Sequence, residues 1–130
     1  MNVLVIDTET ANSVEQPMPY DIGYAIVDTA TGEILLEKSF IVAEIFLDKE
    51  LMKSAYFADK IPQYWKDIKA GKRELKTFFN IRKKFKEVCE KNLIWCVLAH
   101  NARFDYRSLN LTARYLTGSR VKYFLPFGIE

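Results

Sequence analysis

The sequence predicts an α/β domain built on a mixed sheet, antiparallel in its first part and parallel in its second. Three observations indicate this class. Three strand-like segments follow one another in the first 42 residues, helical segments come afterwards, and a compact apolar segment lies between two of those helices. Strands joined by short loops pair antiparallel, whereas a strand reached through a helix pairs in parallel. The 130 residues suit one domain with a real core, so residues 1–130 are treated as a single domain.

The antiparallel part comes from three consecutive segments. Residues 2–7 form a β-branched and leucine-rich run that ends at an acid, which indicates a buried strand. Pro17 and Pro19 then indicate a loop. Residues 20–28 and 33–42 are predicted as the second and third strands, joined by a glycine-containing turn.

The middle of the chain has helical spacing. Residues 48–57 and 61–69 are predicted as short helical pieces, with Pro62 where a helix can begin. From Lys72 to Lys91 the apolar residues recur at a period near 3.6. This period predicts an amphipathic helix with its basic residues on the opposite side.

The last third of the chain supplies the parallel part. Residues 93–99 are a short apolar run, which predicts another buried strand. Residues 104–117 return to helical spacing, and Gly118 is the expected stop of that helix. Residues 121–127 have the composition to begin one more strand.

Charge is divided unevenly along the chain, although the net charge is only +2. Residues 1–59 carry 11 acidic and 3 basic side chains, and residues 60–91 carry 4 acidic and 11 basic ones. An acidic region can hold cations while a basic region attracts a polyanion, which is the combination that a metal-dependent nuclease needs. The competing interpretation, that the basic run is a solvated helix face, is the one that charge alone favours.

The composition argues against a membrane or secreted protein. The apolar runs are far shorter than the roughly 20 residues that cross a bilayer, and no signal-like stretch follows Met1. Cys89 and Cys96 sit in apolar patterns without a CxxC pair, so free thiols are expected instead of a disulfide or a zinc site. A cytoplasmic protein is therefore expected.

The first candidate site is the acidic segment at the end of the first predicted strand, which contains Asp7 and Glu9. Residues two apart on a strand point to the same side, so the two carboxylates are expected to project together from the carboxyl end of the strand. Such a pair repels itself unless a cation lies between its members, and Mg²⁺ and Mn²⁺ prefer oxygen ligands. The alternative is a chance DxE pattern with Asp7 in a turn and Glu9 in water.

The second candidate site follows the apolar segment 93–99, where a predicted strand leads into a helix. Asp105 is a further metal-ligand candidate at this junction, and Phe104 can anchor the turn in the core. A structural role is the alternative, because an acid in the first turn of a helix is favoured by the helix dipole and Asn101 can cap the turn. His100 is interpreted as a structural residue and is given no role in proton transfer.

Together the two segments resemble the DEDD 3′-to-5′ exonucleases, the superfamily that includes the epsilon proofreading subunit of bacterial DNA polymerase III and RNase T. The family's first motif, DxE, is met by Asp7 and Glu9. Residues 21–25, DIGYA, are similar to the IG-containing second strand of the family. The fixed positions of the second motif, HNAxFD, are met by His100, Asn101, Ala102, Phe104 and Asp105.

The resemblance implies an RNase H-like fold and a phosphodiesterase reaction that uses two divalent ions, Mg²⁺ or Mn²⁺. By the family pattern, Asp7 bridges both ions, Glu9 binds the first ion and Asp105 binds the second. The implied substrate is the single-stranded 3′ end of DNA or RNA, removed one nucleotide at a time. The candidates for contacts with this substrate are Thr8, Thr10, Asn101 and Phe104.

The resemblance also bears on partners. Proofreading subunits of the family bind a DNA polymerase, whereas RNase T-like enzymes act alone or as homodimers. The basic face of residues 72–91, with Lys83 and Lys84, is predicted to contact the backbone of the nucleic acid.

The family's third motif, HxxxxD or YxxxD, is not found after Asp105, where the only later acid is Glu130. We therefore expect the chain to be incomplete at its C-terminus and to span two thirds to three quarters of the family domain. Because HNAxFD is typical of the histidine-type branch, the absent base is expected to be a histidine.

Two other protein classes are alternatives. A haloacid-dehalogenase-like phosphatase also begins with a strand and an acidic DxDxT loop, but that class leaves HNARFD unexplained. A nucleic-acid-binding or polymerase-associated module that keeps the fold without a complete catalytic site is the stronger alternative.

Overall fold

The computed structural model describes residues 1–118 and 124, and its centre is a five-stranded mixed sheet with the strand order β4-β3-β2-β1-β5. The strands β1, β2 and β3 pair antiparallel, while β4 pairs in parallel with β3 and β5 in parallel with β1. The predicted fold class is therefore confirmed. The strands are β1 (Asn2–Asn12), β2 (Pro17–Asp28), β3 (Ile34–Val42), β4 (Glu74–Lys76) and β5 (Val97–Leu98).

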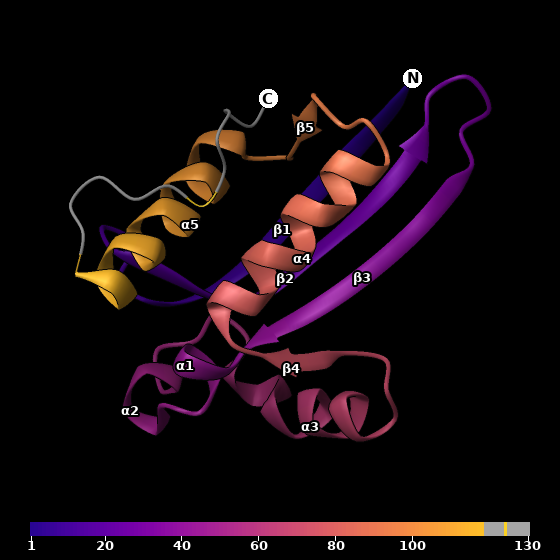
Figure 1. Cartoon of the computed structure of the whole chain (residues 1–130). Helices are drawn as coiled ribbons and strands as arrows, with labels where there is room; N and C mark the ends of the chain where they lie inside the picture. Colours follow the sequence, from indigo (N-terminus) through magenta and orange to yellow (C-terminus); the bar gives the residue numbers. More distant parts are fainter. Residues whose placement is uncertain (119–123, 125–130) are drawn as a thin grey trace.

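The helices lie in two groups (Figure 1). The two long ones, α4 and α5, lie over one face of the sheet, which we call the covered face, and the short ones gather near one end of the sheet. The opposite face is called the outer face. The helices are α1 (Ala43–Phe46), α2 (Lys49–Met52), the 3₁₀ helix η1 (Ala58–Lys60), α3 (Ile61–Lys69), α4 (Phe78–Lys91) and α5 (Ala102–Thr117).

The core forms on the covered face because alternate residues of each strand point to it. Tyr24 of β2 packs edge-on against Phe85 of α4, with ring centroids 5.2 Å apart, and its ring centroid lies 6.0 Å from that of Phe40 of β3. The side chains that bury this face are large and apolar. They include Leu4, Ile6, Ile22, Ile26, Phe40, Phe78, Ile81 and Phe85.

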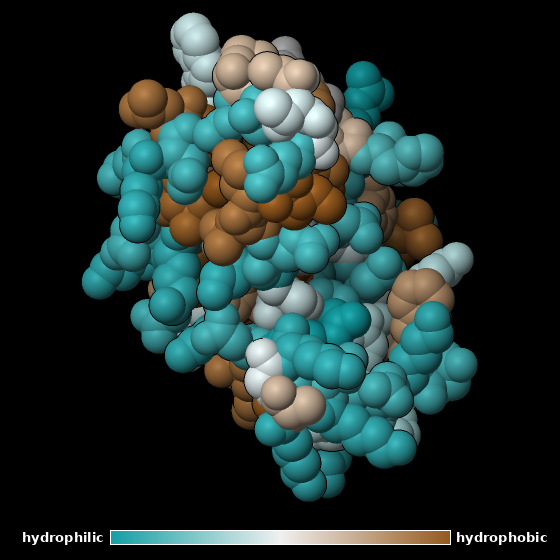
Figure 2. Space-filling view, turned by 90° about the vertical axis from the view of Figure 1, so that its right-hand side faces the viewer, coloured by the Kyte–Doolittle hydropathy of each residue, from teal (hydrophilic) through white to brown (hydrophobic). Residues whose placement is uncertain are grey.

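The face of the molecule on the β3 side is mostly hydrophilic, and its largest hydrophobic area is in the upper half (Figure 2). Hydrophilic side chains dominate the lower half. The β2–β3 hairpin lies at the upper end (Figure 1), and Ile34 and Leu35 at the start of β3 are 55% and 45% exposed. No helix in the described part of the chain is long and apolar enough to cross a membrane.

Two predicted boundaries in the first hairpin are wrong. Strand β1 does not end at Asp7 but continues to Asn12, and β2 begins at Pro17, where a loop was predicted. The register shifts between Glu9 and Thr10, so that Thr10 pairs with Pro19. A proline is tolerated at the first residue of a strand or beside a bulge, which is why both prolines fit into β2.

The predicted helix over 72–91 begins only at Phe78. The hydroxyl of Thr77 accepts a hydrogen bond from the backbone N–H of Asn80 at 3.3 Å, and the Glu44 carboxylate accepts one from the N–H of Phe78 at 2.9 Å. These acceptors satisfy N–H groups that lack a partner inside the helix. The residues before Thr77 are free to extend, and Glu74–Lys76 pairs with β3 as β4.

Two further predictions are adjusted. The apolar run 93–99 contributes only Val97–Leu98 to the sheet, and Trp95 in the same run is 78% exposed. The prediction of a full strand was wrong because a short apolar run by itself does not distinguish a buried strand from a turn. The segment 48–57 holds only the single turn α2. Helix α5 does end at Gly118, which has a φ of 67°, but the possible strand at 121–127 lies outside the described residues. Both cysteines are free, with Cys89 buried and Cys96 half-buried.

Candidate functional site

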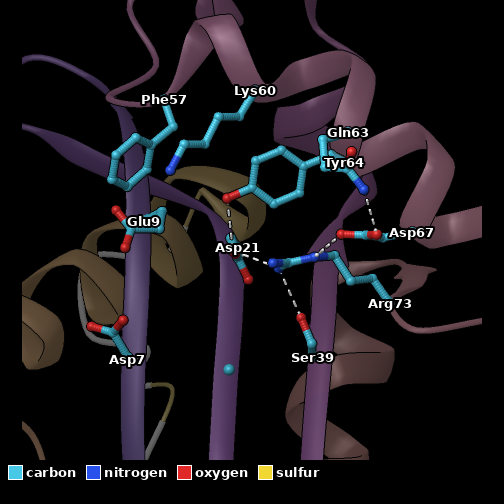
Figure 3. A pocket seen from close by; sticks show the side chains of 11 residues that line it. Asp7, Glu9, Asp21, Ser39, Phe57, Lys60, Gln63, Tyr64, Asp67 and Arg73 are labelled. Atoms are coloured by element: carbon cyan, nitrogen blue, oxygen red, sulfur yellow. Dashed lines mark hydrogen bonds and ion pairs between the residues drawn. The ribbon is translucent and has the colours of Figure 1, made fainter.

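The two carboxylates of the first motif lie on the outer face of β1. Asp7 and Glu9 have the alternation of Val5, which is 40% exposed, whereas Thr8 between them is buried on the covered side. Because the motif lies inside the strand, both carboxylates are held by a paired backbone. They line a cavity of about 390 Å³ between the outer face and helix α3. Figure 3 shows both side chains at this cavity, two residues apart on the same strand.

A third acid, Asp21 on β2, faces Glu9 directly across the sheet and lines the same cavity. Its carboxylate accepts hydrogen bonds from the Tyr64 hydroxyl at 2.9 Å and from the Arg73 guanidinium at 2.8 Å (Figure 3). The guanidinium also donates to Ser39 and forms an ion pair with Asp67 at 3.1 Å, and it lies 4.5 Å from the centroid of the Tyr64 ring. This network connects β2, β3 and α3 around the cavity.

Negative charge accumulates at Glu9. Burial raises the pKa of its carboxyl group above the ordinary value, and the neighbouring Asp7, Asp21 and Asp105 raise it further, while Lys60 lowers it. A carboxylate in such surroundings gains stability from any cation that joins it. The outer face of β1 is therefore an electrostatic environment that favours cation binding.

Burial also raises the pKa of Asp21, although Arg73 and the hydrogen bond from Tyr64 act against this rise. Both partners stabilise the ionised form of the carboxyl group. The guanidinium thus compensates Asp21, whereas Glu9 has only the more distant Lys60 to offset three acids.

Asp105, the acid of the second motif, is buried in the first turn of α5. It lies on the covered side of β1, where it is hydrogen-bonded to Thr8 of the first motif. The Thr8 hydroxyl donates a hydrogen bond to its carboxylate at 2.5 Å. Burial raises the pKa of Asp105, the Thr8 hydrogen bond lowers it, and Asp7 raises it. Asp105 is within electrostatic reach of Asp7 and Glu9, but its carboxylate is turned towards Thr8 on the covered side of β1.

The donor chemistry of the three acids fits a hard divalent cation, because carboxylate oxygens are the ligands that Mg²⁺ and Mn²⁺ prefer. Their arrangement is only partly that of a metal site. Among residues 1–118 and 124, no three histidine, cysteine or acidic side chains are grouped closely enough to hold one ion. Asp7 and Glu9 share a face, and Asp105 is the member that points elsewhere.

The predicted substrate contacts lie around this centre without lining the cavity. Thr10 is half-buried, and its carbonyl accepts a hydrogen bond from the N–H of Tyr56. Asn101 is exposed at the start of α5, where its side chain makes no capping hydrogen bond, and Phe104 is half-buried one position before Asp105. His100 is exposed.

The cavity also contains residues that the sequence did not indicate, above all Phe57, Lys60, Tyr64 and Arg73. Phe57, Lys60 and Tyr64 come from a region without a motif, in or beside the predicted short helical pieces, and Arg73 belongs to the predicted basic helix 72–91, where no contact with the acids was expected. Asp21 lies in a predicted strand. Because side chains two apart point to the same face, the strand pattern places Asp21 on the same face as Gly23, which also lines the cavity. Its proximity to Glu9 depends on the register of the β1–β2 hairpin.

Comparison with known proteins supports the fold. The sequence matches no protein-family model and no curated protein. Among solved structures, the chain is similar to the nuclease domain of 3'hExo, a DEDDh family member, bound to rAMP, with a TM-score of 0.64 and 17% sequence identity. The match covers 97% of this chain and 62% of that nuclease domain, so the chain spans about three fifths of its length. The sheet and helices described above thus form the RNase H-like fold of DEDDh exonucleases.

Proposed function

We propose that the chain carries the core of a metal-dependent 3′-to-5′ exonuclease site that hydrolyses the terminal phosphodiester bond of DNA or RNA. The observation that carries this proposal is the projection of Asp7 and Glu9 together from β1 into one cavity, with Asp105 bonded to Thr8 between them. The fold shared with a DEDDh nuclease domain that binds rAMP supports a nucleotide as the ligand of this cavity.

In the proposed reaction Asp7, Glu9 and Asp105 hold Mg²⁺ or Mn²⁺. Bound ions of this kind supply an activated water and stabilise the leaving 3′ oxygen. The chain's own contribution is to position the carboxylates. The paired backbone of β1 orients Asp7 and Glu9. Asp105 is held by the Thr8 hydroxyl and would have to turn away from it to join the other two acids.

The decisive experiment measures the release of nucleotides from a single-stranded oligonucleotide labelled at its 5′ end, with Mg²⁺ or Mn²⁺ and with EDTA. We expect a ladder shortened from the 3′ end only with the metal, and a loss of at least about 100-fold in rate for Asp7→Asn. Asp48→Asn, which removes an exposed acid at the start of α2, is the matched control and should retain the rate. Shortening that persists in EDTA, or in Asp7→Asn, would contradict the proposal.

A second candidate function is a nucleic-acid-binding or polymerase-associated module without its own cleavage. The observation that favours it is the orientation of Asp105, which leaves no group of three metal ligands among the described residues. Salt-sensitive binding of single strands by the wild-type chain, with no metal-dependent shortening, would support this candidate.

The proposal extends to the substrate, the protein partner and the compartment. A single-stranded 3′ end is the proposed substrate, either a second copy of the chain or a DNA polymerase is the proposed protein partner, and the cytoplasm is the proposed compartment. Helix α4, which contains Lys83 and Lys84, lies over the covered face (Figure 1). Asp7 and Glu9 line the cavity on the outer face. If Lys83 and Lys84 contact the phosphate backbone of a nucleic acid bound at Asp7 and Glu9, the nucleic acid must pass around the edge of the sheet.

A further inference from the structure

A second cavity lies among the short helices that gather near one end of the sheet (Figure 1). It has a volume of about 330 Å³, and its lining residues lie in or next to α1, α2, η1 and α3. Apart from Lys49 and Lys53, the described residues that line it are apolar. A mostly apolar cavity of this size with a few polar groups is typical of binding sites.

Helix α3 contributes to both cavities with different side chains. Tyr64 and Asp67 line the cavity of the candidate site, whereas Trp65 lines the second cavity. No described residue lines both of them. A ligand of the second cavity therefore does not compete for the acids of β1, and it contacts a helix whose other side chains belong to the candidate site.

The apolar residues of the second cavity include buried and exposed side chains. Phe46 and Met52 are 5% and 3% exposed, whereas Leu47 is 54% and Trp65 is 38% exposed. The ring centroids of Phe46 and Trp65 lie 5.1 Å apart. Apolar surface that is supported by a buried aromatic ring thus reaches the solvent at this cavity. A tryptophan in such a place is the residue type that most often dominates the energy of protein interfaces.

The charged groups that line the second cavity are the cations Lys49 and Lys53. The acids beside them in the chain are engaged. Asp48 accepts hydrogen bonds from backbone N–H groups at the start of α2, and Glu50 pairs with Lys53 at 2.9 Å. The side chains of that pair are 82% and 72% exposed, so the pair is weak and an anion of a partner can take the place of Glu50. Lys49 forms no ion pair with any described residue.

We propose that the second cavity docks an acidic peptide segment of a partner protein. A large apolar side chain of that segment packs between Leu47 and Trp65, and its carboxylates pair with the two lysines of the cavity. Charge complementarity carries the choice of partner, because an apolar site lined by cations alone favours an apolar ligand with negative charge. The inference does not rest on the proposed exonuclease, and it gives a protein partner a place to bind that leaves the candidate site open.

The test uses the fluorescence of Trp65. The chain has two tryptophans, and Trp95→Phe leaves Trp65 as the single one. The probe is a peptide with a central Leu-Phe pair flanked on both sides by Asp and Glu. One control peptide has Ser in place of the apolar pair, and another has Lys in place of every acid. We expect the probe to shift the Trp65 emission to shorter wavelength, since docking buries the ring, and to bind at least about tenfold more tightly than either control.

Variants in the same background test the two parts of the contact. Leu47→Gln should weaken probe binding about tenfold, as the loss of an interface anchor does. Lys49→Gln should weaken it about threefold and make it less sensitive to salt. The matched controls are Leu93→Gln, at a leucine that is 83% exposed and lines another cavity, and Lys86→Gln on α4. Both controls should bind like the parent, and thermal melting checks that every variant is folded.

The docking site is overturned if the probe gives no shift at millimolar concentration, if the control peptides bind as tightly, or if Leu47→Gln and Lys49→Gln bind like the parent. Self-association of the chain that Leu47→Gln abolishes, without probe binding, overturns it in favour of a second copy. A larger shift with single-stranded DNA than with the probe overturns it in favour of a nucleic acid. The peptide titration contains neither metal nor nucleic acid, so its result and that of the cleavage assay are independent.

Discussion

The two faces of the central sheet are made by alternate residues of the same strands, but different interactions stabilise them. On the covered face of β2, Tyr24 packs between aromatic rings of β3 and α4. On the outer face of the same strand, Asp21 is bound by Tyr64 and Arg73. The first face is stabilised by apolar burial, whereas the second contains charges whose compensation is incomplete.

This contrast supports the proposal that the outer face carries the functional site. Stability alone does not require three acids around Glu9, since their mutual repulsion disfavours the ionised state. Repulsion that persists in a folded protein is typical of sites that bind a cation or perform chemistry. Four substitutions test this contrast between the two faces, in order of decreasing effect on stability.

The largest effect is expected on the covered face. Phe85 is 1% exposed, and its ring contacts those of Tyr24 and Phe124. Replacing it by alanine leaves a cavity, so Phe85→Ala should reduce the free energy of unfolding by about 3–5 kcal/mol in urea denaturation. Phe79→Ala, at a position 37% exposed on the same helix, should cost much less. Equal costs at the two positions would mean that α4 is not packed as described.

The next effect concerns the outer face. Arg73→Met removes the cation that compensates the buried Asp21, and we expect a loss of roughly 2–4 kcal/mol in the free energy of unfolding. Asp21→Asn in the same chain should recover part of the loss, because the uncompensated charge is then absent. The control is Lys69→Met, which removes a positive charge from an exposed position of α3. A double variant no more stable than Arg73→Met would show that the pair is not coupled.

A smaller effect, of opposite sign, is expected at Tyr24. Its hydroxyl is buried without a hydrogen-bond partner among the described residues, and burial raises its pKa to about 12. Tyr24→Phe removes an unsatisfied polar group and should stabilise the protein by about 1 kcal/mol. Tyr20→Phe should destabilise it, because the Tyr20 hydroxyl accepts a hydrogen bond from Phe57. Destabilisation by both changes would show that the Tyr24 hydroxyl has a partner.

The smallest effect is a pH dependence at Glu9. Because its pKa is raised in the folded state, the folded protein holds this proton more tightly than the unfolded chain does. Stability is therefore lost as the pH rises from the ordinary pKa of a glutamate through the raised one. Glu9→Gln avoids that loss, so its melting temperature should exceed that of the wild type at neutral pH and approach it in acid.

The control for this pH series is Glu37→Gln, an exposed glutamate of β3. It should show no such convergence. A difference between Glu9→Gln and the wild type that is the same at every pH would contradict the raised pKa. Added Mg²⁺ should stabilise the wild type more than Glu9→Gln if the outer face binds the ion.

The sequence predicted most of the fold because its elements have strong periodic signals. Residues 20–28 alternate as a strand does, and the helix from Ala102 ends at the predicted Gly118. The failures occurred where long-range partners override local signals. Pro17 indicated a loop but pairs with Asn12, and Leu75 suited a helix but pairs with Ile41 in the sheet.

The sequence by itself determined the chemistry of the site: the spacing of Asp7 and Glu9 on one face of a strand and the acid at the start of the last helix are local properties of the chain. Only the tertiary structure decided which groups surround them. The register of β1 against β2 placed Asp21 beside Glu9, and the packing of α3 brought Tyr64 and Arg73 to the cavity. Charges act through space over several ångströms, so residues distant in sequence set the electrostatics of the motif.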